Sequence, residues 1–520
     1  MRVGMFWGAA HRLPLSSFVG GCGAKSSIFL ALISATALQA QQPPQPKFSE
    51  LPCFSYSVDP DSIAGTSVRC GYVRVPQDRA NPKSKLRPVE LPVVIYSSPT
   101  AKGTPVILLA GGPGESAIDA TQRVLVQTPL GQMLLRERPI IAFDRRGIHT
   151  DVGRSVPDLG AILLIGAAPR RMVLPVLRDS LAAAAALMRE QGIEPRNFTT
   201  LAASDDIGDV AHALGFDKVV LFGASYGTRD ALQFMRRHPE MVEAAVLDGV
   251  APPPATTLLD SATVAVAAMD VFRRVVADCA KDSVCANEYS DLGDVLRRFG
   301  PDSAKPVLRT ANLPDDGGWK TLQVNPASVM SVLGLASTSE TVRAELPAVM
   351  MDFALGDTLH SDLAAKVLVA AAADPAVSAP RSTTQLVRYA VLCGDRPQGE
   401  PFAGDRTLCD AFRVPFSGPD AIGQVTSDIP TLLISSGYDA QTPAHLAAEA
   451  AKTLSRSQQV FFPMAGHVAF ARPVAMACAA VVIESFLMQP GHEPATRCVA
   501  SVVPAFAPRG VTQQQSRPRR

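Results

Sequence analysis

The fold is decided by one stretch of the sequence, Lys218-Val-Val-Leu-Phe-Gly-Ala-Ser-Tyr-Gly-Thr-Arg229. An apolar, β-branched run leads into Ser225, which has a glycine two residues before it and another two residues after it. A serine on a sharp turn between a strand and a helix needs such small neighbours, because a Cβ at either place would crowd the turn. Residues 228–241 then show the apolar and basic periodicity of an amphipathic helix. The stretch predicts strand, tight turn and helix, with an ordinary glycine turn and a solvated serine as the alternative.

The composition bounds what surrounds this turn. A chain of 520 residues can hold three or four average domains, or one large α/β domain that carries an insertion. Hydrophobic residues make up 47% of the sequence, which is enough for a sizeable core, and the formal net charge is only +1. We therefore predict no nucleic-acid partner and no attraction to an anionic membrane.

Residues 1–40 are organised like a signal peptide. Basic residues such as Arg12 precede an apolar run at 28–38, and small residues up to Ala40 offer a cleavage site. The run is too short to span a bilayer, so we expect export, as a secreted or periplasmic protein, without stable membrane insertion after signal removal. Two alternatives stay open, a later start codon and a lipoprotein-type cleavage before Cys22, of which the second is disfavoured by a short, broken apolar segment.

The cysteine content agrees with export. Nine cysteines minus Cys22 leave an even number, which suits an oxidising compartment. Eight cysteines allow 105 pairings, so a pairing of sequence neighbours is a hypothesis from proximity alone. The hypothesis couples Cys53 with Cys70, Cys279 with Cys285, Cys393 with Cys409, and Cys478 with Cys498. Because the sequence contains no CxxC and no HExxH motif, we predict neither a metal site nor a cofactor.

A glycine-rich loop precedes the serine turn by about a hundred residues. Residues 88–96 and 105–110 are apolar and β-rich, and the second run ends in Gly111-Gly-Pro-Gly114. Glycine allows backbone N–H groups to approach a ligand closely. Alone, the loop is equally well explained as a plain Gly/Pro turn. Together with the serine turn it favours an oxyanion hole formed by the backbone N–H groups of Gly112 and Tyr226.

Charged residues follow another predicted strand at 139–143. For Asp144-Arg-Arg-Gly147 we favour salt bridges that fix the loop over a catalytic role, and we expect His149 to be structural or solvent-facing. Helices are predicted at 174–191 and 201–214, with Asp205 and Asp206 in the first turns of the second, where the helix dipole favours acidic residues.

Two strand ends after the serine carry a carboxylate and a histidine. Asp439 follows a predicted strand at 429–436, and His467 follows one at 459–462. The order serine, aspartate, histidine matches a catalytic triad in which the three strand ends meet at one edge of a parallel sheet. The sequence therefore predicts Ser225, Asp439 and His467 as catalytic residues. Asp248, which ends the predicted strand 244–248, is the second candidate for the acid.

The strand pattern is interrupted once. From about 251 to 425 it gives way to alanine-rich helical segments, and strands resume afterwards, which favours an insertion over an independent domain. We therefore divide the chain into a signal peptide (1–40), the first part of the core (41–250), an inserted cap (251–425), the second part of the core (426–505) and a flexible tail (506–520).

These motifs together resemble the secreted tripeptidyl aminopeptidase-like group of α/β-hydrolases, relatives of prolyl iminopeptidase. The resemblance runs from about Cys53 to Cys498. It rests on Gly111-Gly-Pro-Gly-Glu-Ser116, Asp144-Arg-Arg-Gly147, Gly223-Ala-Ser-Tyr-Gly-Thr228, Leu247-Asp-Gly-Val250, Gly437-Tyr-Asp-Ala-Gln-Thr-Pro443 and Gly466-His467. Ala110 replaces a histidine of the prolyl iminopeptidases, and Ile148-His-Thr-Asp151 replaces the glycine and serine that usually follow the DxRG motif. The resemblance implies an α/β-hydrolase fold, a mostly parallel sheet flanked by helices, with an inserted, mainly helical cap.

The resemblance also implies an activity. It points to an aminopeptidase that releases short peptides, of the tripeptidyl type, from free N-termini, with acidic cap residues holding the ammonium group. His467, oriented by Asp439, would take the proton of Ser225 as its oxygen attacks the acyl carbonyl, and water would release the acyl group. The alternatives are a carboxylesterase that acts on small acyl esters with the same triad, and a catalytically silent binding protein, against which the intact triad argues.

Overall fold

The computed structural model describes a large part of the chain. The described residues are 46–61, 63–81, 84–148, 170–255, 261–299, 309–315, 318–324, 333–355, 385–396, 407–501 and 506. The chain divides into Met1–Pro44, which lies outside them, and Gln45–Arg520, which is described below. The predicted signal peptide, His149 and the predicted tail apart from residue 506 also lie outside the described residues.

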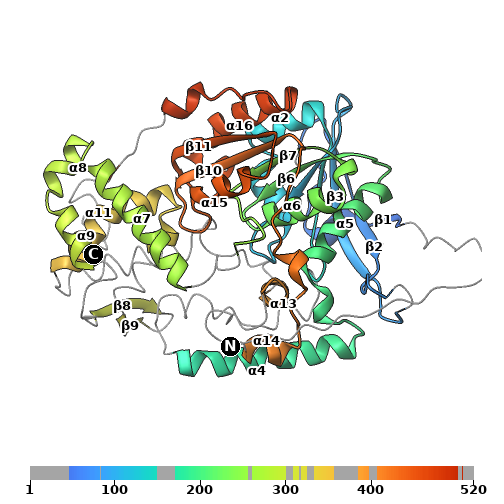
Figure 1. Cartoon of the computed structure of the whole chain (residues 1–520), viewed down its shortest axis with the longest axis horizontal. Helices are drawn as coiled ribbons and strands as arrows, with labels where there is room; N and C mark the ends of the chain where they lie inside the picture. The colour runs from blue at the N-terminus through green and yellow to red at the C-terminus, as the bar shows by residue number, and fades with distance from the viewer. Residues whose placement is uncertain are drawn as a thin grey trace, which may run out of the picture. The chain divides into compact units, whose positions relative to one another are not determined.

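A nine-stranded sheet forms the centre of Gln45–Arg520 (Figure 1). Its strands are β1 Phe48–Glu50, β2 Ser67–Val75, β3 Val89–Ser97, β4 Val106–Leu109, β5 Ile140–Phe143, β6 Val219–Ala224, β7 Val242–Asp248, β10 Thr431–Tyr438 and β11 Ser457–Gly466. They lie in the order β1-β2-β3-β5-β4-β6-β7-β10-β11. The strands from β5 to β11 in this order run parallel, and β1, β2 and β3 pair antiparallel. The carboxyl ends of the parallel strands therefore share one edge.

Helices cover both faces of this sheet. Alternate residues of β6 point to opposite faces, so Val220 and Phe222 enter one hydrophobic cluster while Val219 and Leu221 enter another. The first cluster packs against α2 (Pro129–Glu137) and α16 (Pro473–Met488). The second packs against α5 (Thr200–Ala213), α6 (Gly227–Arg237) and α15 (Ala444–Ala451). Strands that are buried on both faces have continuous apolar runs, which is why the sequence shows them clearly.

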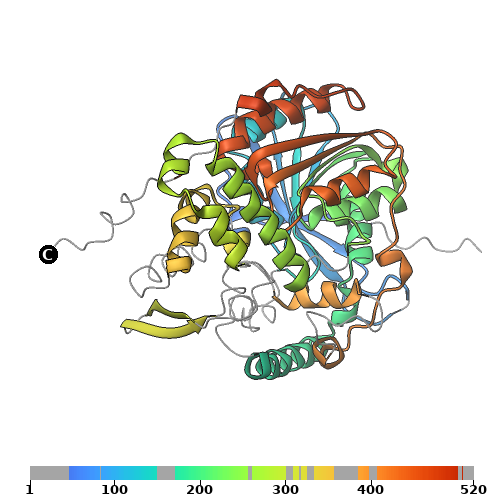
Figure 2. The ribbon, with the colours of Figure 1, turned by 60° about the vertical axis from the view of Figure 1, so that its left-hand side comes forward.

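The chain between β7 and β10, called the insert here, adds no strand to this sheet among its described residues. Its elements are α7 Ser261–Cys279, α8 Ser283–Glu288, α9 Leu292–Phe299, β8 Arg309–Asp315, β9 Gly318–Val324, α11 Glu340–Leu355, α13 Gln385–Gly394 and α14 Thr407–Phe412. Helices α7, α9 and α11 pack together and against the ends of β10 and β11, as Figure 2 shows, while α13 and α14 pack on α4 (Arg170–Glu190). The antiparallel hairpin of β8 and β9 was not predicted. The boundaries given above for the signal peptide, the two parts of the core, the cap and the tail stay predictions.

Most of the predicted elements are confirmed within a few residues. The serine turn lies between β6 and α6, the helices predicted at 174–191 and 201–214 are α4 and α5, and the later strands are β7, β10 and β11. Two segments were not predicted: β1, the edge strand of the sheet, and the first half of β2 beside it, where exposed residues interrupt the apolar pattern. Short helical segments complete the structure: η1 Cys53–Tyr56, α1 Ala117–Ala120, η2 Thr121–Leu125, η4 Pro195–Asn197, η5 Pro239–Met241, η7 Pro419–Ala421, η8 Ala469–Ala471 and η9 Arg497–Ser501.

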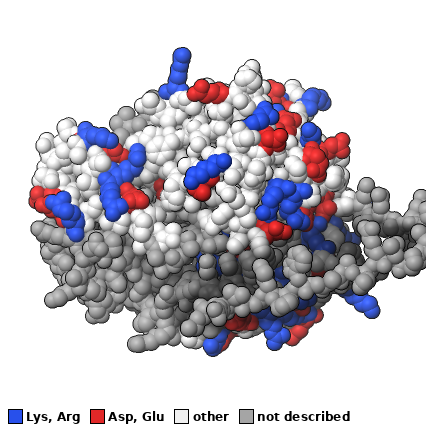
Figure 3. Space-filling model, viewed as in Figure 1, with Lys and Arg blue, Asp and Glu red and all other residues white. Residues whose placement is uncertain are grey.

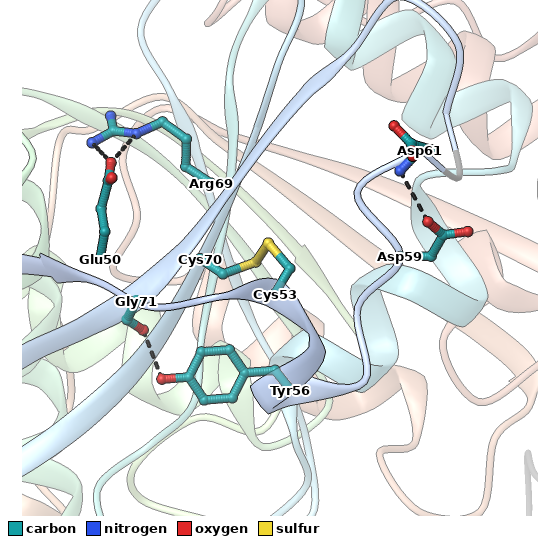
Figure 4. Close-up of a disulfide and its surroundings, with 8 residues drawn as sticks. All are labelled: Glu50, Cys53, Tyr56, Asp59, Asp61, Arg69, Cys70 and Gly71. Carbon is teal, nitrogen blue, oxygen red and sulfur yellow. Dashed lines mark hydrogen bonds and ion pairs between the residues drawn. A yellow bond between two sulfur atoms is a disulfide. The ribbon is translucent and has the colours of Figure 1, made fainter.

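Four disulfides join the cysteines in the pairs that proximity predicted. Their Cα–Cα distances range from 5.1 to 5.6 Å. The Cys53–Cys70 bridge ties η1 to β2 (Figure 4). Beside it, the hydroxyl of Tyr56 donates to the carbonyl of Gly71 at 2.9 Å. This bridge holds the N-terminal edge of the sheet together.

The loop after β5 is fixed by salt bridges and hydrogen bonds, as predicted. The Asp144 carboxylate accepts hydrogen bonds from Ser116 Oγ at 2.8 Å and from the Ile118 N–H at 3.1 Å. Arg146, fully buried, donates from Nε and Nη2 to Asp206 at 2.7 and 2.6 Å. Asp206 therefore does more than complement the helix dipole, the role that the sequence suggested, because its carboxylate also neutralises the buried guanidinium of Arg146.

The surface agrees with the near-neutral net charge. On the face drawn in Figure 3, basic and acidic side chains of the described residues are interspersed, without a large field of one sign. None of the helices in the described ranges is both long and apolar enough to cross a membrane.

Candidate active site

Ser225 lies on a strained turn between β6 and α6. Its φ of +54° is in the left-handed region, which is rare for a residue other than glycine and typical of functional turns. A Cβ on Gly227 would lie 2.0 Å from the carbonyl oxygen of Leu109, and one on Gly223 would lie 2.8 Å from the Cα of Thr228. Both glycines are therefore required by contacts across the turn, as the sequence predicted.

The glycine loop after β4 lies directly against this serine. A Cβ on Gly111 would be only 3.2 Å from Ser225 Oγ, so the loop can pass the hydroxyl only with glycine at this position. Gly112, with a φ of +105°, lines the same cavity as Ser225. Tyr226 stands at the start of α6, where backbone N–H groups have no partner inside the helix. Gly112 and Tyr226, the residues predicted to supply the N–H groups of an oxyanion hole, thus line one cavity with Ser225.

Asp439 and His467 form a buried pair. His467 Nδ1 lies 2.8 Å from Asp439 Oδ2, and both side chains are more than nine-tenths buried. Burial alone would raise the pKa of Asp439, but the nearby His467 and hydrogen bonds from His467 and Thr442 hold it below the usual value. The carboxylate is therefore kept ionised, the state that orients an imidazole. No hydrogen bond joins Ser225 Oγ to His467 among the described residues.

Thr442 completes this pair, and the sequence analysis did not assign it a role. Its hydroxyl donates to Asp439 Oδ2 at 2.7 Å and lies 3.0 Å from His467 Nδ1. The backbone N–H groups of Gln441 and Thr442 donate to the other carboxylate oxygen at 2.9 and 2.8 Å. The signal for this turn was present in the sequence, because a Thr-Pro pair opens α15 three residues after Asp439.

Asp248, the second candidate for the acid, binds backbone amides instead of the imidazole. Its carboxylate accepts from the N–H groups of Ala469 at 3.1 Å and Phe470 at 2.9 Å, and its carbonyl oxygen accepts from the Ser225 N–H at 2.9 Å. Burial raises its pKa to about 6 against these hydrogen bonds. Asp248 therefore links the turn of Ser225 to the loop of His467.

A cavity opens at Ser225, and the insert supplies part of its wall. Asp395, one residue beyond the end of α13, lines it together with Gly112, Arg229 and Thr442. Asp395 Oδ2 accepts hydrogen bonds from the hydroxyls of Tyr226 and Thr200 and pairs with Arg229 at 3.3 Å. Asp395 Oδ1, in contrast, is buried without a hydrogen-bond partner in the described part of the chain. Sequence reasoning did not find this residue.

Hydrogen bonds from Arg229 hold the backbone of the cavity wall in place. Its Nη2 donates to the carbonyl oxygens of Pro252 at 2.9 Å and Ala255 at 2.7 Å, and its guanidinium lies 5.2 Å from the centre of the Tyr226 ring. These carbonyls follow β7, where the insert begins. Arg229 thus joins the helix after Ser225 to the start of the insert.

The comparisons with known proteins agree with this geometry. Residues 104–472 match the family described as the alpha/beta hydrolase fold, which is more than half of the chain. The chain belongs to the α/β-hydrolase family. The serine protease Hip1 of Mycobacterium tuberculosis is 24% identical over 446 residues, covering 75% of this chain and 80% of its own. The tripeptidyl aminopeptidase of Streptomyces coelicolor is 26% identical over 342 residues, covering 63% of this chain and 60% of its own.

A solved structure is similar as well. The proline iminopeptidase of Mycobacterium smegmatis aligns over 81% of this chain and 98% of its own, with a TM-score of 0.37 and 15% identity. Together, the family match and the curated relatives identify this α/β-hydrolase as a serine hydrolase of the peptidase-like kind.

Proposed function

We propose that this α/β-hydrolase is an exported aminopeptidase that releases short peptides, of the tripeptidyl type, from free N-termini through an acyl-enzyme intermediate. The single observation that carries the proposal concerns Asp395, which lines the cavity of Ser225 and has one buried carboxylate oxygen without a hydrogen-bond partner among the described residues. A buried carboxylate oxygen without a donor is costly, and a substrate ammonium group would satisfy it. The similarity to a tripeptidyl aminopeptidase and the four disulfides support the substrate class and the export.

The proposed mechanism assigns one role to each residue at the sheet edge. His467 takes the proton of Ser225 as Oγ attacks the scissile carbonyl, and Asp439 holds the imidazole and stabilises its charged form. The N–H groups of Gly112 and Tyr226 stabilise the oxyanion. His467 then gives the proton to the departing amine. In the second half of the reaction a water molecule attacks the acyl carbon while His467 takes its proton, and this proton passes to Ser225 Oγ as the acyl group leaves.

Asp395 would select substrates with a free amino terminus. Its Oδ2 is held by Tyr226 and Thr200, so its orientation is fixed before a substrate binds. Because Tyr226 directly follows Ser225, this network sets the position of Oδ1 relative to the nucleophile. A fixed position for the ammonium group would place the scissile bond a set number of residues along the peptide.

A substrate panel tests the proposal. We would compare a tripeptide p-nitroanilide with a free amino group, its N-acetylated form, and p-nitrophenyl butyrate, for wild-type protein and for Asp395→Asn. We expect cleavage of the free tripeptide only, and a loss in kcat/KM of about 10- to 100-fold in Asp395→Asn, because an ion pair to a buried carboxylate becomes a neutral contact. Asp410→Asn in α14 is the matched control.

The same panel separates the alternatives. Equal cleavage of the free and acetylated peptides would contradict the aminopeptidase proposal. Turnover of the butyrate ester without either peptide would favour a carboxylesterase, which the same triad serves equally well.

A further inference from the structure

A hydroxyl of the insert contacts the backbone of His467. The side-chain oxygen of Thr338, which is 1% exposed, accepts a hydrogen bond from the His467 N–H. The two residues are 129 positions apart in the sequence. His467 follows the last residue of β11, where the main chain leaves the sheet, so this N–H has no strand as its partner. The insert therefore supplies the hydrogen-bond acceptor that the sheet cannot.

Gly466 makes this contact possible. A Cβ at this position would lie 2.3 Å from the Thr338 carbonyl oxygen, 2.4 Å from its Cα and 2.5 Å from its Oγ1. Any larger residue would push Thr338 away from the histidine loop. The Gly-His pair of the sequence thus contains a glycine whose purpose is close packing against the insert.

A second hydrogen bond fixes the same segment to the core. Thr338 lies two residues before α11, and Glu340 at the start of this helix accepts a hydrogen bond at 3.0 Å from the N–H of Val474 in α16. The insert thus contacts the core both at His467 and seven residues after it. These two hydrogen bonds fix the segment around Thr338 to the core.

The remaining anchors of His467 come from the core. Its ring is held by Asp439 and Thr442, and its carbonyl oxygen accepts from Arg472 Nε at 2.8 Å. Asp248 holds the amides that follow. Thr338 is therefore the anchor of the backbone N–H, and it alone among these partners belongs to the insert.

We infer that Thr338 is a positioning residue for His467, so that the insert forms part of the catalytic apparatus instead of acting only as a cover over the cavity. The inference rests on the proposed role of His467 as general base. An imidazole that shifts by about 1 Å can reduce the rate by about 100-fold. Loss of the Thr338 hydroxyl should therefore lower kcat and leave KM nearly unchanged, because the walls that bind the substrate stay in place.

The test compares three substitutions. Thr338→Val removes the acceptor at nearly constant volume, and Thr338→Ser keeps it. Ser337→Ala removes a neighbouring hydroxyl that donates to the Gly334 carbonyl in its own turn. We expect kcat to fall about 10- to 100-fold in Thr338→Val, with KM within about threefold of wild type, and to stay within about threefold in the other two. Thr338→Ala serves as the second variant if Thr338→Val does not fold, as judged by thermal unfolding.

A second readout does not depend on the substrate. The rate of inactivation by a fluorophosphonate should fall with kcat in Thr338→Val and recover in Thr338→Ser. Absence of labelling in wild type would contradict the serine mechanism itself. Two results would overturn only the role of Thr338, provided that wild type is labelled normally. One is a labelling rate in Thr338→Val equal to that of wild type, and the other is a loss in Thr338→Ser as large as the loss in Thr338→Val.

Discussion

At the scale of single residues, two buried carboxylates at neighbouring strand ends have different partners. Asp439, after β10, has one oxygen on the His467 ring and the other on backbone amides. Asp248, at the end of β7, has both oxygens on backbone amides. Their positions in the sequence are alike, and only the hydrogen bonds separate a candidate catalytic acid from a residue that holds a loop.

The first prediction compares these two carboxylates. Asp439→Asn should lower kcat by about 10⁴-fold, because an amide neither stabilises the imidazolium nor selects the right tautomer. Asp248→Asn should lower it far less, since the amide oxygen still accepts one of the two backbone hydrogen bonds. Steady-state kinetics on folded protein measure both, and the opposite ranking would make Asp248 the acid.

The second prediction concerns pH. Burial raises the pKa of Asp248 to about 6, so the folded state binds this proton more tightly than the unfolded state. Its contribution to stability is then greatest below the unfolded pKa and falls as the pH rises toward and past 6. Relative to Asp248→Asn, wild type should lose up to about 3 kcal/mol of unfolding free energy between pH 4 and pH 7. Urea unfolding across this range measures the difference, and parallel curves for the two proteins would contradict the raised pKa.

At the scale of elements, the strand, turn and helix around Ser225 depend on backbone packing. The Gly227 position touches the carbonyl of Leu109 in β4, so the start of α6 and the end of β4 approach as closely as two backbones can. This contact fixes where the helix leaves the sheet. It also brings the glycine loop after β4 to the serine.

The third prediction follows from this contact. Gly227→Ala should destabilise the protein by more than about 3 kcal/mol or prevent folding, because the new Cβ would overlap backbone atoms that cannot move independently. Gly293→Ala in α9 is the matched control: its Cβ would meet nothing closer than 3.8 Å, and alanine favours a helix by about 0.5–1 kcal/mol. Thermal unfolding of both variants is the measurement. Equal midpoints would mean that the turn tolerates a side chain at 227.

The sequence predicted residues whose positions depend on the local secondary structure. It did not predict residues whose roles depend on contacts between segments that are distant in the chain. Ser225, Asp439 and His467 could be proposed from the sequence because each follows a buried strand within a few residues, and parallel strands bring such ends together. Thr338 and Asp395 come from the insert. Their contacts depend on how segments that are distant in the sequence pack together. Neither the local periodicity of apolar residues nor a turn motif indicates such packing. The exposed edge strand β1 was missed because only three residues form it.

At the scale of the whole molecule, disulfides join segments in both the core and the insert. Cys53–Cys70 and Cys478–Cys498 lie in the core, and Cys279–Cys285 and Cys393–Cys409 lie in the insert. Cys393 precedes Asp395 by two residues, so one bridge lies beside the cavity wall. Such a chain is suited to an oxidising compartment.

The fourth prediction ranks these bridges. Removing Cys53–Cys70, with a separation of 17 residues, should cost about 3 kcal/mol, and removing Cys279–Cys285, with a separation of 6, about 2 kcal/mol, because a longer loop restricts the unfolded chain more. Paired Cys→Ala variants in thermal unfolding measure both losses. A larger loss for the shorter loop would contradict the entropic account.

The central claim is that Ser225 is the nucleophile of a serine hydrolase. The most direct test is to treat wild-type and Ser225→Ala protein with a fluorophosphonate and to locate the adduct by peptide mass spectrometry. We expect one adduct in wild type, on Ser225, none in the variant, and a loss of turnover of up to ~10⁶-fold. Labelling at another serine, or undiminished turnover in folded Ser225→Ala protein, would contradict the claim.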